Sequence, residues 1–145
     1  MNKIQKYSIG AALALFYYLA YSGNLSHIIA YHEQHHLFLF TEAYFEQQVQ
    51  SEGFFSYLTD FIIQFFYYPA LGSALLALLL ASVYLMTSNI IRFLFGKEDL
   101  LHLSVIPSLA LFYHTMEASH TLVPITISVL TLAFINLMLW ITRSH

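Results

Sequence analysis

The 145-residue chain has no cysteine, so it forms no disulfide bonds and no metal site with thiolate ligands. Charged residues are also scarce: they make up 9% of the chain, whereas a typical soluble domain has roughly 25%. Only five residues are Lys or Arg, and their scattered positions form no basic patch that would bind a nucleic-acid backbone. The scarcity of charge therefore argues against an ordinary soluble domain, and we expect no nucleic-acid partner.

Apolar residues, by contrast, are abundant. They make up 59% of the chain, and the mean hydropathy is +0.65. Because one membrane-spanning helix needs ~20 mostly apolar residues, this length has room for about four. The sequence predicts an all-α, polytopic membrane protein that forms a single domain over residues 1–145 in the lipid bilayer. The four transmembrane helices are expected at about residues 7–30, 69–92, 100–116 and 121–141.

Several residues mark the expected helix ends. Pro69 suits the first turn of the second span, and Gly96 suits a helix C-cap after it. Asp99 is a candidate N-cap for the third span, in which Pro107 predicts a kink. The basic and apolar start of the chain also resembles a secretory signal, but Tyr17 and its neighbouring tyrosines favour an uncleaved first span.

The basic residues predict the orientation. Lys3 and Lys6 precede the first span, Arg92 and Lys97 lie between the second and third, and Arg143 follows the fourth. A four-span arrangement places all five on one side of the membrane, and the positive-inside rule makes that side the cytoplasm. We therefore predict a bacterial inner-membrane protein with both termini inside and residues 31–68 in the periplasm.

The periplasmic segment 31–68 holds five of the eight acidic residues and no Lys or Arg. It divides at Ser51-Glu52-Gly53 into two parts, each with apolar residues at helical spacing. Both parts predict amphipathic helices that lie in the membrane interface with their aromatic side chains toward the lipid. Since these helices carry acidic groups only, attraction to anionic lipids does not explain them.

Histidines gather on the same predicted side. His32, His35 and His36 lie three and four residues apart, a spacing at which two imidazoles on a helix can reach one Zn²⁺. The turn between the third and fourth spans adds a second group. The candidate ligands for a divalent metal, or members of a proton relay, are His32, His35, His36, His114, Glu117 and His120. The alternative is that these side chains simply occupy a polar interface, since no strict HExxH pattern is present.

Two features of the spans predict helix packing. Asn89 and Asn136 are polar side chains near the cytoplasmic ends of the second and fourth spans, where an amide can join two helices. Gly72, Ala77 and Ala81 belong to a stripe of small residues along the second span, which is typical of a helix-packing face.

The stretch from Tyr31 to Gly72 resembles an uncharacterised family of polytopic inner-membrane proteins from Bacteroidota. The resemblance covers about residues 1–95, and the matching positions are Glu33, Gln34, Leu37, Phe38, Gly53, Tyr57, Leu58, Phe61, Gln64, Phe65, Phe66, Tyr67, Pro69 and Gly72. It implies no activity. It does imply longer relatives with more spans and a C-terminal extramembrane part, so that this chain would be an N-terminal portion or a truncated member.

The order of a span, a long outer loop and further spans also resembles membrane glycosyltransferases of the GT-C type, which use lipid-phosphate sugar donors. This likeness implies a role for Glu33 as a catalytic general base or as a metal-binding residue. The chain has no basic residue on the predicted outer side to bind a donor phosphate, and it lacks the later spans of such enzymes.

These observations favour a membrane scaffold, or the N-terminal module of a larger membrane protein, with other membrane-protein subunits as possible partners. No cofactor is predicted, and for this chain alone we do not expect an enzyme. Two alternatives stay open: a fragment of a GT-C-like transferase acting through Glu33, and metal or proton handling at the outer His/Glu cluster.

Overall fold

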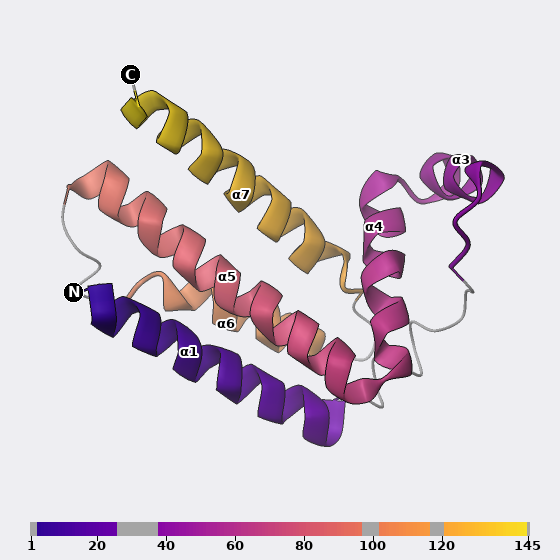
Figure 1. Cartoon of the computed structure of the whole chain (residues 1–145), viewed down its shortest axis with the longest axis horizontal. Helices are drawn as coiled ribbons and strands as arrows, with labels where there is room; N and C mark the ends of the chain where they lie inside the picture. The colour runs from indigo at the N-terminus through magenta and orange to yellow at the C-terminus, as the bar shows by residue number, and fades with distance from the viewer. Residues whose placement is uncertain (1–2, 26–37, 97–101, 117–120, 145) are drawn as a thin grey trace.

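A computed structural model describes residues 3–25, 38–96, 102–116 and 121–144, and within these ranges the chain forms helices and no strand (Figure 1). The elements are α1 (Lys3–Ala20) with the π-helical turn η1 (Tyr21–Leu25), α3 (Glu42–Ser51), α4 (Phe54–Ile63) with the 3₁₀ turn η2 (Gln64–Tyr67), α5 (Pro69–Phe95), α6 (Val105–Thr115) and α7 (Val123–Ser144). The predicted all-α class is confirmed.

Helix α5 is the centre of the fold. Helices α1, α6 and α7 all pack along it, and α1 makes the most extensive of these contacts. Figure 1 shows that α1 and α6 run antiparallel to α5, whereas α7 runs parallel to it. The face of α5 that carries the small residues Gly72, Ala77 and Ala81 is buried, which confirms that this stripe packs against other parts of the protein.

Within the described part of the chain, two helices, α5 and α7, are long and apolar enough to cross a membrane. The predicted span at 100–116 differs from expectation, because its helix α6 has only 11 residues. At 1.5 Å per residue this helix is about 16 Å long, roughly half the thickness of the hydrocarbon core. Pro107 is the third residue of α6, where a missing N–H group breaks no helical hydrogen bond, so the helix begins beside this proline and is not kinked by it.

The predicted ends of α5 and the break between α3 and α4 are confirmed. Helix α5 begins at Pro69 and ends at Gly96, whose φ of +60° is the left-handed conformation of a glycine C-cap. The break at Ser51-Glu52-Gly53 is also present: α3 ends at Ser51, and Gly53 turns the chain into α4 with a φ of +93°. The predicted N-cap Asp99 lies outside the described residues.

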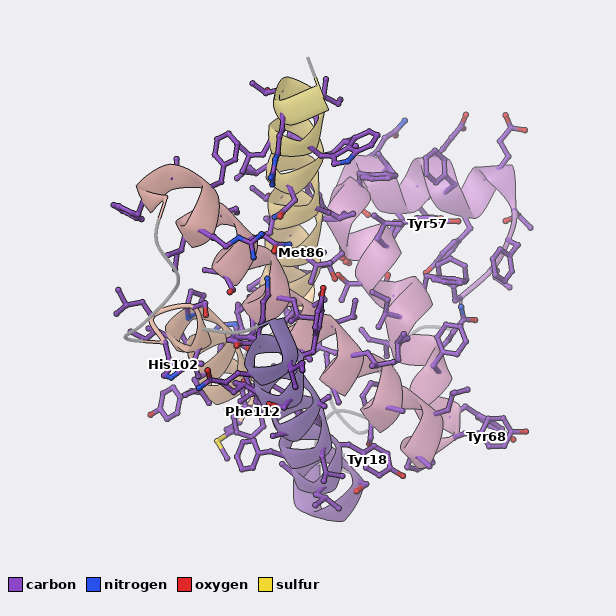
Figure 2. All side chains as sticks on the ribbon, turned by 60° about the vertical axis from the view of Figure 1, so that its left-hand side comes forward. Tyr18, Tyr57, Tyr68, Met86, His102 and Phe112 are labelled. Atoms are coloured by element: carbon purple, nitrogen blue, oxygen red, sulfur yellow. The ribbon has the colours of Figure 1, made fainter. Side chains whose placement is uncertain are left out.

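Aromatic and hydroxyl side chains join α1 to the short helix α6. Tyr17 and Tyr21 are fully buried, and their rings contact the ring of Phe112, which is labelled in Figure 2. The Tyr17 hydroxyl is 2.8 Å from the Ser108 hydroxyl, and the Tyr21 hydroxyl is 2.7 Å from that of Thr115. These contacts hold α6 in place, although few of its residues pack on α1.

Helices α3 and α4 lie at one end of the bundle, with α4 running across the ends of α5 and α7 (Figure 1). The hydroxyls of Thr59 in α4 and Thr126 in α7 are 2.9 Å apart, and both side chains are buried. The opposite end of the bundle contains the first residues of α1 and the last residues of α5 and α7. Lys6, Arg92 and Arg143 are therefore on one end of the molecule, and the acidic α3–α4 corner is on the other.

Candidate functional site

A groove of about 570 Å³ runs between α6 and α7 over the surface of α5. We call it the α6–α7 groove. It is lined by Val83 and Thr87 of α5, Pro107, Ala110 and Leu111 of α6, and Ile127, Ser128, Thr131 and Leu132 of α7. It forms because α6 and α7 each pack on α5 but make little contact with one another.

The lining of the α6–α7 groove is apolar apart from three hydroxyl groups, those of Thr87, Ser128 and Thr131. The Thr87 hydroxyl is buried, and among the described residues it has no hydrogen-bond partner. None of the lining residues is charged or a histidine, so the groove has no group for acid–base chemistry. Its shape and composition suit the packing of an apolar body.

Helix α7, which forms one wall of the groove, is apolar but exposed: only 11% of its most apolar 18-residue stretch is buried inside the molecule. Phe134 is 60% exposed and Leu137 is 50% exposed. Such a surface is unfavourable in water because apolar area costs about 25 cal/mol per Å² when it is hydrated. The face is suited to lipid or to another apolar helix.

A second cluster of polar side chains lies at the α3–α4 corner. The amide nitrogen of Gln48 donates to Asp60 at 2.8 Å and to Glu52 at 3.1 Å, and the Ser56 hydroxyl donates to the same Glu52 oxygen at 2.9 Å. Burial raises the pKa of the nearby Tyr44 hydroxyl, and the carboxylates of Asp60 and Glu52 raise it further. Because one amide holds both carboxylates, this cluster fixes α3 against α4.

Of the predicted metal-binding and catalytic residues, the structure describes only His114. His114 lies in the last turn of α6, and His102 precedes the first turn of the same helix (Figure 2). His32, Glu33, His35, His36, Glu117 and His120 lie outside the described residues. Among the residues that the structure describes, no three His, Cys, Asp or Glu side chains gather closely enough to hold a metal ion. The metal site, the proton relay and the catalytic role of Glu33 stay predictions.

The two predicted asparagines each join two helices, although not through each other. The Asn89 oxygen accepts a hydrogen bond from the Lys6 ammonium group of α1, and the Asn136 amide donates to the Met86 carbonyl of α5 at 3.3 Å. Sequence reasoning missed the hydroxyl contacts of Tyr17 and Thr59. The available signal was a polar group inside an otherwise apolar helix, which needs a partner wherever it is buried.

These features define a class: an all-helical protein with two helices of membrane-spanning length and, in its described part, no assembled metal site. The chain belongs to a family of unknown function, DUF6057, which matches residues 2–145. This agrees with the resemblance to an uncharacterised family. No curated protein and no solved structure shows significant similarity to the chain.

Proposed function

We propose that the chain is an integral protein of the bacterial inner membrane that acts as a helical scaffold, either on its own or as the N-terminal module of a larger membrane protein. The observation that carries this proposal is the exposure of α7. An apolar helix of membrane-spanning length also occurs in the core of soluble proteins, but there it is mostly buried. In α7, by contrast, only 11% of the most apolar 18-residue stretch is buried. A secretory signal is apolar too, but α7 begins more than a hundred residues into this chain.

The direction of the helices supports four passes across the bilayer. Helices α5 and α7 run parallel to one another, and α6, which lies between them in the chain, runs in the opposite direction. The hydroxyl hydrogen bonds and the buried side chains of α6 keep this short helix in contact with the rest of the protein. In a membrane, non-helical backbone is tolerated only in such a protein environment. In this arrangement the basic end faces the cytoplasm, with both termini inside.

The α6–α7 groove is the surface through which the scaffold would act, and its occupant would be another transmembrane helix. Helix–helix contacts in membranes favour small side chains, which permit close approach, and hydroxyl groups, which bond across helices. In the groove, Ala110 has such a small side chain, and Ser128 and Thr131 carry hydroxyl groups. An acyl chain has no group that could pair with these hydroxyls, which favours a helix over lipid.

Orientation is tested with single-cysteine variants, for which the cysteine-free chain needs no prior alteration. Gln50→Cys places a thiol on an exposed position of α3, and Thr142→Cys places one on an exposed position near the end of α7. In cells with a permeabilised outer membrane, we expect a membrane-impermeant maleimide to label the first variant and to label the second only after lysis. Equal labelling of both in intact cells would contradict the proposed topology.

The scaffold role is tested with a photo-crosslinking amino acid at Thr131, inside the α6–α7 groove, and at Phe134, an exposed position of the same helix outside it. We expect a crosslinked band larger by a discrete protein mass at position 131 and adducts with lipid alone at position 134. Lipid adducts alone at both positions would refute the scaffold role while leaving the membrane location intact.

A further inference from the structure

The basic end of the bundle contains a second cavity, distinct from the α6–α7 groove. It has a volume of about 360 Å³ and lies between the last turns of α5 and α7. Arg92 and Asn89 line it from α5, and Arg143, Trp140 and Asn136 line it from α7. We call it the arginine cavity. A further cavity of about 460 Å³ is also lined by Arg92 and Arg143, so both arginines border both cavities.

The polar groups of the arginine cavity are arranged to donate hydrogen bonds. Each guanidinium group has five N–H donors in a planar fork that matches two oxygens of a phosphate. The oxygen of the Asn89 amide already accepts from Lys6, which leaves its NH₂ group as a donor. None of the described residues that line the cavity is Asp or Glu.

The remaining side chains place the cavity at the depth of lipid headgroups. Trp140 is 68% exposed and Phe93, which also lines the cavity, is 45% exposed. Exposed aromatic rings near the ends of apolar helices favour the membrane–water interface, and arginines at helix ends extend their charge toward the headgroups. Toward the middle of the bundle the outer face of α7 is apolar, as at Phe134 and Leu137, and could lie along an acyl chain.

We propose that the arginine cavity binds the phosphate group of an anionic phospholipid, with Arg92 and Arg143 as its ligands. The proposal rests on the membrane location proposed above. Basic cavities between transmembrane helices on the cytoplasmic side are a known type of headgroup site, and the acidic opposite end of this molecule has no comparable pair of cations. The bound lipid would join the ends of α5 and α7, neither of which contains an Asp or Glu residue that could pair with the arginine of the other.

Trp140 provides the measurement, because it is the only tryptophan of the chain and lines the cavity. The purified full-length chain is reconstituted in phosphatidylcholine vesicles that contain increasing fractions of phosphatidylglycerol brominated on its acyl chains. A parallel series uses brominated phosphatidylcholine. Bromine quenches tryptophan fluorescence at short range, so the two curves compare the occupancy of the site by anionic and by zwitterionic lipid.

We expect half-maximal quenching at a clearly lower fraction of the anionic lipid. Since each basic residue near a membrane surface contributes about 1 kcal/mol of attraction, Arg92→Gln and Arg143→Gln should each reduce the preference about fivefold. Arg143→Lys keeps the charge but not the planar fork, and should retain part of the preference. Thr142→Gln is the matched control: it alters a neighbouring exposed residue that does not line the cavity, and should leave the preference unchanged.

The outcomes separate the two proposals. Quenching by neither lipid would overturn the membrane location and the lipid site together. Equal quenching by both lipids, or a preference that survives both Arg→Gln substitutions, would overturn the lipid site and leave the membrane location supported. Millimolar inorganic phosphate is added in a further series. If it abolishes the preference at constant ionic strength, the ligand is soluble phosphate and the assignment to lipid is wrong.

Discussion

At the scale of single residues, the interior depends on hydroxyl groups that pair across helices. Tyr17 with Ser108, Tyr21 with Thr115, and Thr59 with Thr126 connect elements that are far apart in the sequence. Each pair is buried, so removing one hydroxyl leaves the other hydroxyl inside the protein with one hydrogen bond fewer. In membranes such bonds average about 0.6 kcal/mol, because the alternative states also find partners.

Tyr17→Phe tests one of these pairs. It removes a single oxygen and should lower the free energy of unfolding in detergent by about 0.6–1 kcal/mol. Tyr18→Phe is the matched control, since Tyr18 packs on the core only in part and has no side-chain hydrogen bond among the described residues. We expect little change in the control. Equal effects of the two substitutions in equilibrium unfolding would show that the Tyr17 hydroxyl contributes nothing specific.

Gly72→Ala tests close packing at the start of α5. A Cβ atom at this position would lie 2.5 Å from the ring of Phe66, which is itself buried. The ring would have to move, and overpacking of this kind costs about 1–3 kcal/mol. Gly23→Ala adds the same methyl group where no described atom lies within 4 Å, and should be nearly neutral.

A double variant makes the Gly72 test specific. Phe66→Leu removes part of the ring that the new methyl group would meet, so Gly72→Ala should be less destabilising in the Phe66→Leu background than in the original chain. The thermal unfolding temperatures of the four proteins give this comparison. Strictly additive effects would mean that the clash with Phe66 is not the cause.

At the scale of elements, the position of α3 depends on the turn between α3 and α4. Helix α3 packs mainly on α4, through Gln48 and the aromatic rings around Tyr57 (Figure 2). The turn itself passes through Gly53, whose φ of +93° and ψ of +164° lie in a region that is almost exclusive to glycine. The orientation of α3 therefore depends on one residue without a side chain.

Gly53→Ala should strain this turn by about 1–3 kcal/mol. No described atom lies within 4 Å of the added Cβ, so the cost arises from the backbone alone. We expect faster limited proteolysis between Ser51 and Phe54 while the bundle of α1, α5, α6 and α7 stays protected. Ser51→Ala, which removes a hydroxyl bonded to its own helix, is a control for changes near the turn. Unchanged proteolysis in Gly53→Ala would contradict the importance of this conformation.

At the scale of the whole molecule, large apolar side chains lie on the surface as well as in the core. The outward face of α7 carries large apolar side chains, while buried positions of the bundle include Ser73, Ser104 and Ser108. Among the described residues, charge is confined to the two ends of the bundle, with Lys6 and the arginines at one and the acidic corner at the other. A bilayer between these ends would meet the apolar faces and leave both charged regions near water.

A charge on the outward face of α7 distinguishes a membrane protein from a soluble one. Phe134→Arg places a guanidinium group in the middle of the helix, where it should reduce insertion by about 2.5–3.5 kcal/mol. Thr142→Arg places the same charge near the helix end, where it can reach the headgroups at little cost. Carbonate extraction of membranes should release the first variant more readily than the second.

A soluble protein would behave in the opposite way. Replacement of an exposed Phe134 by Arg would then reduce apolar surface in water, raise solubility and leave the fold unchanged. Higher yields of soluble, folded Phe134→Arg protein would therefore contradict the proposed membrane location.

Features that depend on neighbouring residues in the chain were predictable from the sequence. The all-helical class, the start of α5 at Pro69, its end at Gly96 and the break at Gly53 follow from local backbone chemistry and apolar periodicity. The small-residue face of α5 was predictable for the same reason. The extent of α6 was not, because the apolar run over 100–116 does not reveal how much of it is helical.

Only the tertiary structure decided which polar groups meet. Lys6 pairs with Asn89, Gln48 joins Asp60 to Glu52, and Arg92 borders the same cavity as Arg143. Helical periodicity assigns each side chain to a face of its own helix, but the rotation and offset of two packed helices depend on the summed contacts of the bundle. The sequence by itself therefore determined an apolar, helical chain, whereas the packing around α5 decided the shape of the α6–α7 groove and of the arginine cavity.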